Sequence, residues 1–263
     1  MAPTLRILGL AIQSYPLAVL LAAGGGLWLA VRAARILGMD GDRLYDLGFY
    51  ALLGTALGAR LTYVLTHLGA YVDAPLSVLS LTPTALWWPG GLLVGLLVAV
   101  VYWRKHPLPL PLTLDAAAVG LSLALAIERV GAFLGGQGLG QATTMPWGVT
   151  LWEQVRHPVQ VYEALALLAV FFVLWRQLAR RRYDGQIALL FVLLYGGSRL
   201  FLEAYRAQPL LIPGGFRAVQ VIALLATLGS LTALYARRFS GRDVQEPPFP
   251  PSIPPDGGKA KPR

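Results

Sequence analysis

The chain has 263 residues, of which 56% are hydrophobic and only 13% are charged, and its formal net charge is +9. A soluble domain carries about 25% charged residues, so this composition excludes an ordinary soluble protein and indicates a polytopic membrane protein. The sequence contains no cysteine. That absence excludes disulfide bonds, thiolate metal sites, a cysteine nucleophile of its own and acylation of the chain on cysteine.

Seven apolar stretches approach the roughly 20 residues that a helix needs to cross the hydrocarbon core of a membrane. They cover residues 15–36, 44–67, 90–103, 113–134, 158–176, 186–206 and 217–236. The first follows the N-terminal residues without a break, so we expect no separate signal peptide. The third is short and begins at Pro89-Gly90-Gly91, which favours a tilted helix or a re-entrant start. The pattern predicts an all-α integral membrane protein with seven transmembrane helices.

The basic residues predict the orientation in the membrane. Most of the 22 lysines and arginines lie in alternate loops or in the tail, among them Arg32, Arg35, Arg43, Arg104, Lys105, Arg176, Arg180, Arg181, Arg182, Arg237 and Arg238. The positive-inside rule then places the N-terminus outside and the C-terminus in the cytoplasm. The net positive charge follows from this bias and from attraction to anionic lipids, so we expect no nucleic-acid partner.

Composition divides the chain into two parts. Residues 240–263 are polar and rich in proline, which predicts a disordered cytoplasmic tail after a transmembrane domain of residues 1–239. No internal repeat is visible, which argues against a small transporter built from inverted repeats. Tryptophans flank the spans on the predicted outer side, at Trp87, Trp88, Trp147 and Trp152, and we interpret them as an interfacial belt.

Several charged residues fall inside the predicted spans or at their ends. They are Arg60, Arg129, Arg199, Asp115, Glu128, Glu163 and Glu203. An ionisable group at the bilayer centre costs about 2.5–3.5 kcal/mol on insertion scales, so such residues mark pairing, cavities or function. Arg199 and Glu203 are four residues apart and are expected to pair across one helical turn. Such an arginine either holds a lipid phosphate or only staples the helix bundle.

Two polar stretches lie at ends of spans. In ERVGAFLGGQGLGQ, residues 128–141, the adjacent Glu128 and Arg129 are expected to point to different sides of their helix. The glycines predict a bent or unwound segment that serves either headgroup approach or close helix packing. In VRHPVQVYEA, residues 155–164, Gln160 and Glu163 share one helix face and are expected to point into the bundle.

Five motifs together resemble one family, the prolipoprotein diacylglyceryl transferases of bacterial membranes. They are GARLTYVLTH at 58–67, WWPGGLLVGLL at 87–97, ERVGAFLGGQGLG at 128–140, RHPVQVYEAL at 156–165 and YGGSRLFLEAYR at 195–206. The fourth is the most specific, because it is similar to the family pattern Arg-His-Pro-x-Gln-x-Tyr-Glu. The resemblance covers nearly the whole chain up to the tail.

The resemblance implies an activity and a location. The family transfers a diacylglyceryl group from phosphatidylglycerol to the lipobox cysteine thiol of a prolipoprotein, in the bacterial cytoplasmic (inner) membrane. The expected partners are therefore phosphatidylglycerol, prolipoprotein signal peptides and membrane lipids, with no cofactor and no metal. Arg129 and Arg199 are expected to hold the lipid phosphate, and His157, Glu203 and Tyr15 to act in catalysis. Further residues expected to support the site are Arg60, Gly140, Gln160, Tyr162, Glu163 and Arg206.

The chain departs from the family motifs at four positions. Pro89 stands where the family has the histidine of His-Gly-Gly, and Ala132, Gly135 and Gln137 replace two asparagines and a glutamate. A proline side chain can neither accept nor donate a proton, so His157 or a carboxylate would have to act as the base. Two hypotheses stay open: a working transferase, and a catalytically impaired paralogue that binds phospholipid or lipoprotein without turnover.

Overall fold

The computed structural model describes residues 3–7, 10–71, 86–151 and 153–240. Its α-helices are α1 (Ser14–Ile36), α2 (Gly41–Thr66), α3 (Trp88–Lys105), α4 (Leu110–Leu134), α5 (Val159–Leu178), α6 (Gln186–Leu202) and α7 (Ala218–Ser240). Two antiparallel hairpins pair β1 (Thr4–Ile7) with β2 (Leu10–Gln13) and β3 (Val149–Leu151) with β4 (Gln154–Arg156). Short 3-10 turns cover η1 (Leu68–Tyr71) and η3 (Glu203–Tyr205). The predicted tail from residue 241 onward and Trp152 lie outside the described residues.

Six helices among the described residues are long and apolar enough to cross a membrane: α1, α2, α4, α5, α6 with the turn that follows it, and α7. The all-helical membrane class is thus as the composition predicted. The third predicted span corresponds to α3, which ends in Arg104 and Lys105 and is not among the six. The sixth predicted span was too long as a single helix, because α6 ends at Leu202 and a 3-10 turn follows.

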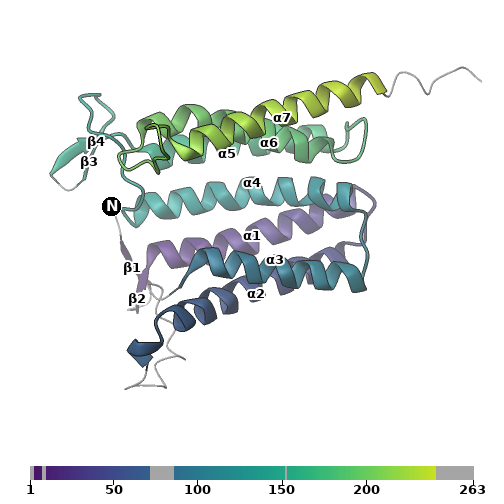
Figure 1. The fold of residues 1–263 in the computed structure, drawn as a ribbon, viewed down its shortest axis with the longest axis horizontal. Helices are drawn as coiled ribbons and strands as arrows, with labels where there is room; N and C mark the ends of the chain where they lie inside the picture. The colour runs from purple at the N-terminus through teal and green to yellow at the C-terminus, as the bar shows by residue number, and fades with distance from the viewer. Residues whose placement is uncertain (1–2, 8–9, 72–85, 152, 241–263) are drawn as a thin grey trace, which may run out of the picture.

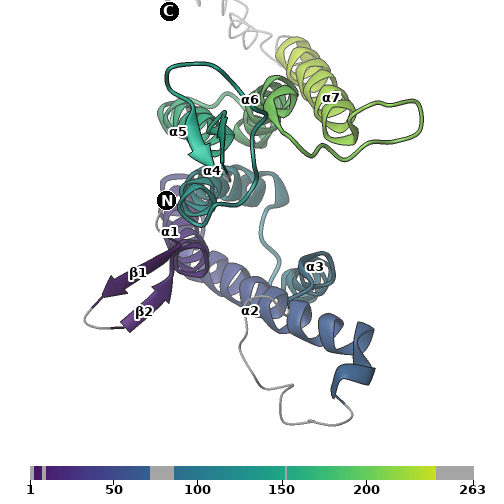
Figure 2. The same cartoon turned by 90° about the vertical axis from the view of Figure 1, so that its left-hand side faces the viewer.

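Helix α4 lies at the centre of the bundle (Figures 1 and 2). It packs against α1 on one side and against α5 and α6 on the other, while α7 covers α6. Helices α2 and α3 form a pair that is attached to this body through α1. Figure 2 shows the pair standing away from the α5–α7 layer. The central position of α4 brings its side chains into contact with three other helices.

Small residues permit the close crossing of α1 and α4. A Cβ atom added at Gly120 would lie 2.4 Å from the carbonyl oxygen of Gly26, and one added at Gly26 would lie 2.7 Å from the Cβ of Ala124. Neither position has room for a side chain. Lipid chains are as apolar as leucine, so helices in a membrane associate through such close backbone packing rather than through the hydrophobic effect.

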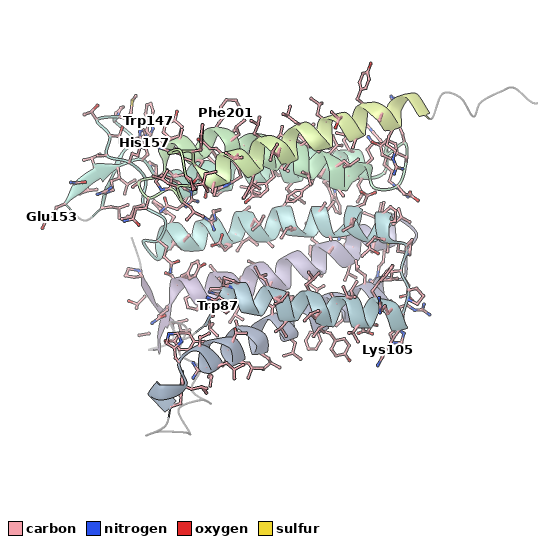
Figure 3. The ribbon with its side chains drawn as sticks, in the orientation of Figure 1. Trp87, Lys105, Trp147, Glu153, His157 and Phe201 are labelled. Carbon is pink, nitrogen blue, oxygen red and sulfur yellow. The ribbon has the colours of Figure 1, made fainter. Side chains whose placement is uncertain are left out.

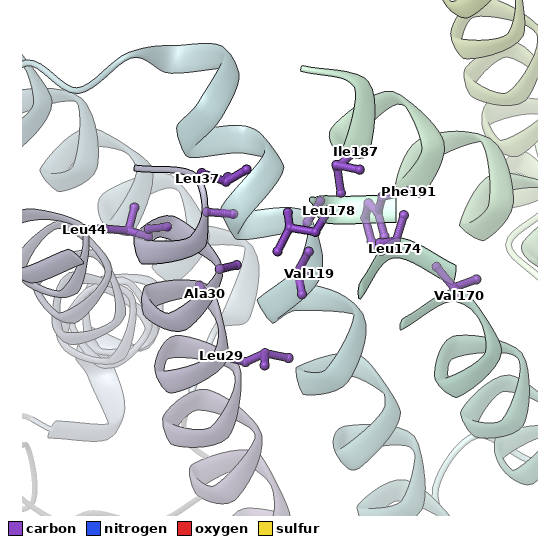
Figure 4. Packing of buried hydrophobic residues seen from close by; sticks show 14 of the residues in the cluster. Leu29, Ala30, Leu37, Leu44, Val119, Val170, Leu174, Leu178, Ile187 and Phe191 are labelled. Carbon is purple, nitrogen blue, oxygen red and sulfur yellow. The ribbon is translucent and has the colours of Figure 1, made fainter. Parts of the chain in front are cut away.

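A buried apolar cluster, here called the apolar core, joins α1, the start of α2, α4, α5 and α6 at one end of the bundle (Figure 4). Its larger members include Leu29, Leu37, Leu44, Val119, Leu174, Leu178, Ile187 and Phe191. At the same end, the buried carboxylate of Asp115 accepts hydrogen bonds from the Gly185 and Ala188 amides, both at 2.8 Å. Gly185 is the N-cap residue of α6 and Ala188 lies in its first turn, where the N–H groups have no partner within the helix. Asp115 therefore ties α6 to α4.

The two ends of the bundle differ in chemistry. The loops that follow α1, α3 and α5 lie at one end with the basic residues, such as Lys105, and both hairpins lie at the other (Figures 1 and 3). Trp87, Trp147 and His157 are at the hairpin end. Trp87 and Trp147 are exposed. Charged residues of α4, α5 and α6 gather near the hairpin end and form the site described next, whereas Asp115 lies at the opposite end.

Candidate active site

Six charged side chains gather in one network near the hairpin end, here called the ionic cluster. They are Glu128 and Arg129 near the end of α4, Glu163 in α5, Arg199 near the end of α6, Glu203 in η3, and Arg206 just beyond it. Three carboxylates face three guanidinium groups, so the formal charges cancel. Sequence separations of up to 43 residues are bridged, because α4, α5 and α6 pack against one another.

Glu163 is the centre of the ionic cluster. Its carboxylate is 3% exposed and contacts three guanidinium groups. Arg206 Nη2 donates to both of its oxygens at 2.7 and 2.9 Å, and Arg129 Nη1 donates to Oε2 at 3.2 Å. Arg199 Nη1 donates to Oε1. The expected inward direction of Glu163 is confirmed, and so is that of Gln160, which is 1% exposed.

Glu203 is the second carboxylate of the cluster that pairs with more than one arginine. Arg199 Nη2 donates to its Oε2 at 2.6 Å, which confirms the predicted pair across one turn, and Arg206 Nε lies 3.3 Å from the same oxygen. Arg217 donates to the backbone carbonyl of Glu203. Both terminal nitrogens of Arg199 are thus bound to carboxylates. Arg217 stands at the first position of the predicted span 217–236, and no motif in the sequence indicated this contact.

The prediction that Glu128 and Arg129 point to different sides was wrong. Arg129 Nε donates to Glu128 Oε2 at 2.5 Å, and the Tyr15 hydroxyl of α1 donates to Glu128 Oε1 at 3.1 Å. Successive Cβ atoms do leave a helix in different directions, but the long arginine side chain bends back to its neighbour. In a low-dielectric setting, pairing of the two charges outweighs the bend. Glu128 is therefore a site residue that the sequence reasoning did not select.

The glycine-rich segment after α4 is unwound, as predicted. Gly136 and Gly138 both have φ of 71°, which favours glycine. Gln160 donates from Nε2 to the carbonyl of Gln137, which fixes this segment against α5. A Cβ atom added at Gly140 would lie 2.1 Å from the His157 carbonyl oxygen, so this glycine serves close packing of backbone on backbone.

Aromatic side chains lie beside the cluster rather than within it. The His157 ring packs edge-on against Tyr162 and Tyr205, with ring centroids 6.2 and 5.1 Å apart, and its Nδ1 lies 3.3 Å from the Tyr162 hydroxyl. Trp147 donates its indole N–H to the same hydroxyl at 2.8 Å. The predicted site residue Arg60 lies on α2, with its guanidinium over the ring of Tyr71. The structure thus places His157 with the aromatic residues and Arg60 on a separate helix.

Arg129 is the most exposed cation of the cluster. Its side chain is 26% exposed, against 16% for Arg199 and 19% for Arg206. Its Nε and Nη1 bind carboxylates, while Nη2 donates to no group in the part of the chain that the structure describes. Guanidinium nitrogens bind phosphate oxygens well. Arg129 is therefore the group of the cluster best placed to receive an anion from outside it.

The model of the family described as prolipoprotein diacylglyceryl transferase matches residues 3–236. The chain belongs to this family. A protein of Bordetella avium named phosphatidylglycerol–prolipoprotein diacylglyceryl transferase is 34% identical over 251 residues, which cover 90% of this chain and 95% of that protein. A protein of the same name from Clostridioides difficile is 28% identical over 222 residues, 84% of this chain and 89% of its own length. One from Chromohalobacter salexigens is 34% identical over 187 residues, 69% of this chain and 70% of its own length.

The structure also locates the positions where this family member departs from the motifs. Pro89 is exposed in the first turn of α3, and Gln137 is exposed in the segment after α4. Ala132 is 3% exposed within α4, in the turn after Glu128 and Arg129. None of these three side chains can act as a proton acceptor at neutral pH. A base must therefore come from another residue.

Proposed function

We propose that this family member transfers a diacylglyceryl group from phosphatidylglycerol to the lipobox cysteine thiol of a prolipoprotein. The relatives' names state this donor and acceptor. The observation that carries the proposal is the ionic cluster, in which the partly exposed Arg129 has a nitrogen available for an anion. The chain has no cysteine, so a thiol nucleophile has to come from the second substrate.

The chemistry requires a fixed cation beside the departing phosphate. Breaking the bond between the glyceryl carbon and the phosphate oxygen places additional negative charge on that oxygen. A guanidinium held in place before the reaction stabilises this charge without reorganising. We assign this role to Arg129. Arg199, which pairs with the same Glu163 carboxylate, has a supporting role. The two carboxylates that bind Arg199 also fix its position.

The other predicted site residues receive positioning roles in this proposal. Arg206 and Glu163 hold the cluster together, and Gln160 fixes the segment after α4. Gly140 permits the approach of that segment to His157. Tyr162 and His157 form an aromatic wall at the hairpin end, where a signal peptide would contact the protein. Tyr15 orients Glu128, and Glu203 orients Arg199.

We also propose seven spans, with the N-terminus outside and residues 240–263 as a cytoplasmic tail after a domain of residues 1–239. Helix α3 has 18 residues and so measures about 27 Å at 1.5 Å per residue, close to the 30 Å core. The grouping of basic loops at one end supports this orientation in a bacterial cytoplasmic membrane. The ionic cluster then lies toward the outer leaflet.

The test is conversion of a lipobox peptide by the purified protein in phosphatidylglycerol vesicles, followed as a mass increase of the peptide. We expect conversion by the wild type and a loss of about 100-fold or more in Arg129→Gln. Arg32→Gln serves as the control, because Arg32 packs over Trp28 at the opposite end. Lipid binding without any product from the wild type would establish instead the impaired paralogue that binds without turnover.

A further inference from the structure

The transfer reaction needs a proton acceptor, because the thiolate and not the thiol is the nucleophile. A cysteine thiol has a pKa of about 8.5, so only about 3% is ionised at pH 7. The acceptor has to lie close to the phosphate site, since the sulfur attacks a carbon one bond from the phosphate oxygen. The candidates near Arg129 are His157 and the three carboxylates of the ionic cluster.

Three of these four groups are poorly placed. The His157 side chain contacts Tyr162 and Tyr205, and among the described residues it forms no hydrogen bond or ion pair with a member of the ionic cluster. Both oxygens of Glu163 already bind guanidinium groups, and its side chain is 3% exposed. Glu203 is 2% exposed and shared by two arginines. Neither carboxylate has room for a thiol beside it.

Glu128 differs from the other carboxylates in partners and in access. Among the residues that the structure describes, it contacts a single arginine, through Oε2, while its Oε1 accepts only from the neutral Tyr15 hydroxyl. Its side chain is 16% exposed, against 3% for Glu163 and 2% for Glu203. A hydroxyl can exchange for a thiol far more readily than a guanidinium can. Glu128 is also bound to the cation that we assign to the phosphate.

The charge balance of the cluster links lipid binding to this carboxylate. Three carboxylates and three guanidinium groups leave the cluster neutral at rest. A phosphodiester adds one negative charge and competes with Glu128 for Arg129. An anion placed next to a carboxylate, together with loss of its cation, favours the protonated form of that carboxylate. The thiol of the peptide is then the nearest source of a proton.

We propose that Glu128 is the general base of this protein, and that the lipid phosphate activates it by displacing it from Arg129. This inference rests on the proposed function above. The S–H bond breaks as its proton passes to Glu128 Oε1, and the sulfur forms a bond to the glyceryl carbon. The carbon–oxygen bond to the phosphate breaks, and its electron pair stays on the phosphate oxygen. Glu128 then returns the proton to that oxygen, which releases glycerol phosphate and restores the carboxylate.

The first experiment compares Glu128→Gln with the wild type in phosphatidylglycerol vesicles. Turnover of the lipobox peptide is expected to fall by about 10²–10⁴-fold at pH 7, the usual contribution of a general base. Binding of phosphatidylglycerol is expected to be as tight as in the wild type or tighter, because the variant removes the anion that competes for Arg129. Turnover within threefold of the wild type, or a parallel loss of binding and turnover, would overturn the proposal.

The pH profile separates a base from a structural residue. In Glu128→Gln the rate is expected to rise about tenfold per pH unit up to about pH 8.5, because the thiol has to ionise unaided. The wild-type rate should change far less over this range. Tyr15 from α1 and Arg129 from α4 contact Glu128, and Tyr195 from α6 interacts with it electrostatically. Glu163 from α5 is linked to Glu128 through Arg129, and Arg199 from α6 is linked through Glu163. All of these groups are present in both proteins. A flat profile in the variant would overturn the proposal.

Two further variants keep the test decisive. Asp46→Asn is the matched control, since Asp46 also accepts from a tyrosine hydroxyl, that of Tyr102 at 3.3 Å, but far from the cluster. It should behave as the wild type in both assays. If Glu128→Gln does not fold, Glu128→Asp replaces it in the test. The aspartate retains a carboxylate on a shorter side chain, so the rate should fall while the pH profile stays as flat as that of the wild type. A steep profile in Glu128→Asp would contradict the proposal. Failure of the wild type itself would refute the proposed function instead.

Discussion

Helices α4, α5 and α6 each contribute to two regions of opposite chemistry, the apolar core at the basic end and the ionic cluster at the hairpin end. The apolar core is held by dispersion between close-packed side chains, and lipid chains offer a separated helix nearly the same environment. The ionic cluster is held by charge pairs for which the hydrocarbon chains of lipid offer no substitute. The two ends of the same helices therefore resist separation for different physical reasons.

The largest effect should come from removing the centre of the ionic cluster. Glu163→Ala leaves three guanidinium groups without their shared carboxylate, and we expect a loss of about 3–5 kcal/mol of stability together with loss of activity. The loss of stability is measured by thermal unfolding in detergent, with size-exclusion chromatography as the readout. An unchanged melting temperature would show that the cluster does not hold the helices.

A smaller effect is expected from a cavity in the apolar core. Leu174→Ala removes a side chain that is fully buried, and we expect a loss of about 2 kcal/mol, at the low end for such a change because lipid replaces water in the reference state. Turnover per folded molecule should stay within twofold of the wild type. A variant of normal stability but low activity would show that the two regions are coupled.

Asp115, a buried polar residue at the same end of the bundle as the apolar core, is the site of the next prediction. Asp115→Asn retains one acceptor oxygen, so one of the Gly185 and Ala188 amides loses its partner. We expect a loss of about 1 kcal/mol. Hydrogen exchange of the first turn of α6 should increase, while α7 remains a control for global opening. Equal increases in the exchange rates of α6 and α7 would contradict a local stabilising role of Asp115.

The smallest effect should occur at the exposed edge of the hairpin end. Trp147→Phe removes the indole donor to the Tyr162 hydroxyl but keeps an aromatic ring. Trp147 is 58% exposed, so we expect a change in stability of at most about 0.5 kcal/mol. The apparent KM for the peptide measures whether the aromatic wall takes part in binding. A large fall in melting temperature would assign Trp147 a structural role.

The sequence predicted those features that depend on neighbouring turns of one helix. Arg199 and Glu203 pair because residues four apart lie on one helix face, and Gln160 and Glu163 point inward together for the same reason. The unwound segment after α4 followed from its glycines. The same reasoning failed for Glu128 and Arg129, because helix geometry places the Cβ atoms but not the ends of long side chains.

Composition, hydrophobic length and local motifs were enough to predict the membrane class, the approximate positions of the spans and the family, because these features do not depend on how helices pack. The charge pairs that join different helices follow from the tertiary structure alone. Glu128 reaches Tyr15 across 113 residues, and Glu163 reaches Arg206 across 43. These contacts depend on the crossing of α1 and α4 at Gly26 and Gly120 and on the packing of α5 and α6 around α4. Such contacts between helices depend on the steric fit of complete helix surfaces, which cannot be predicted from a local sequence pattern.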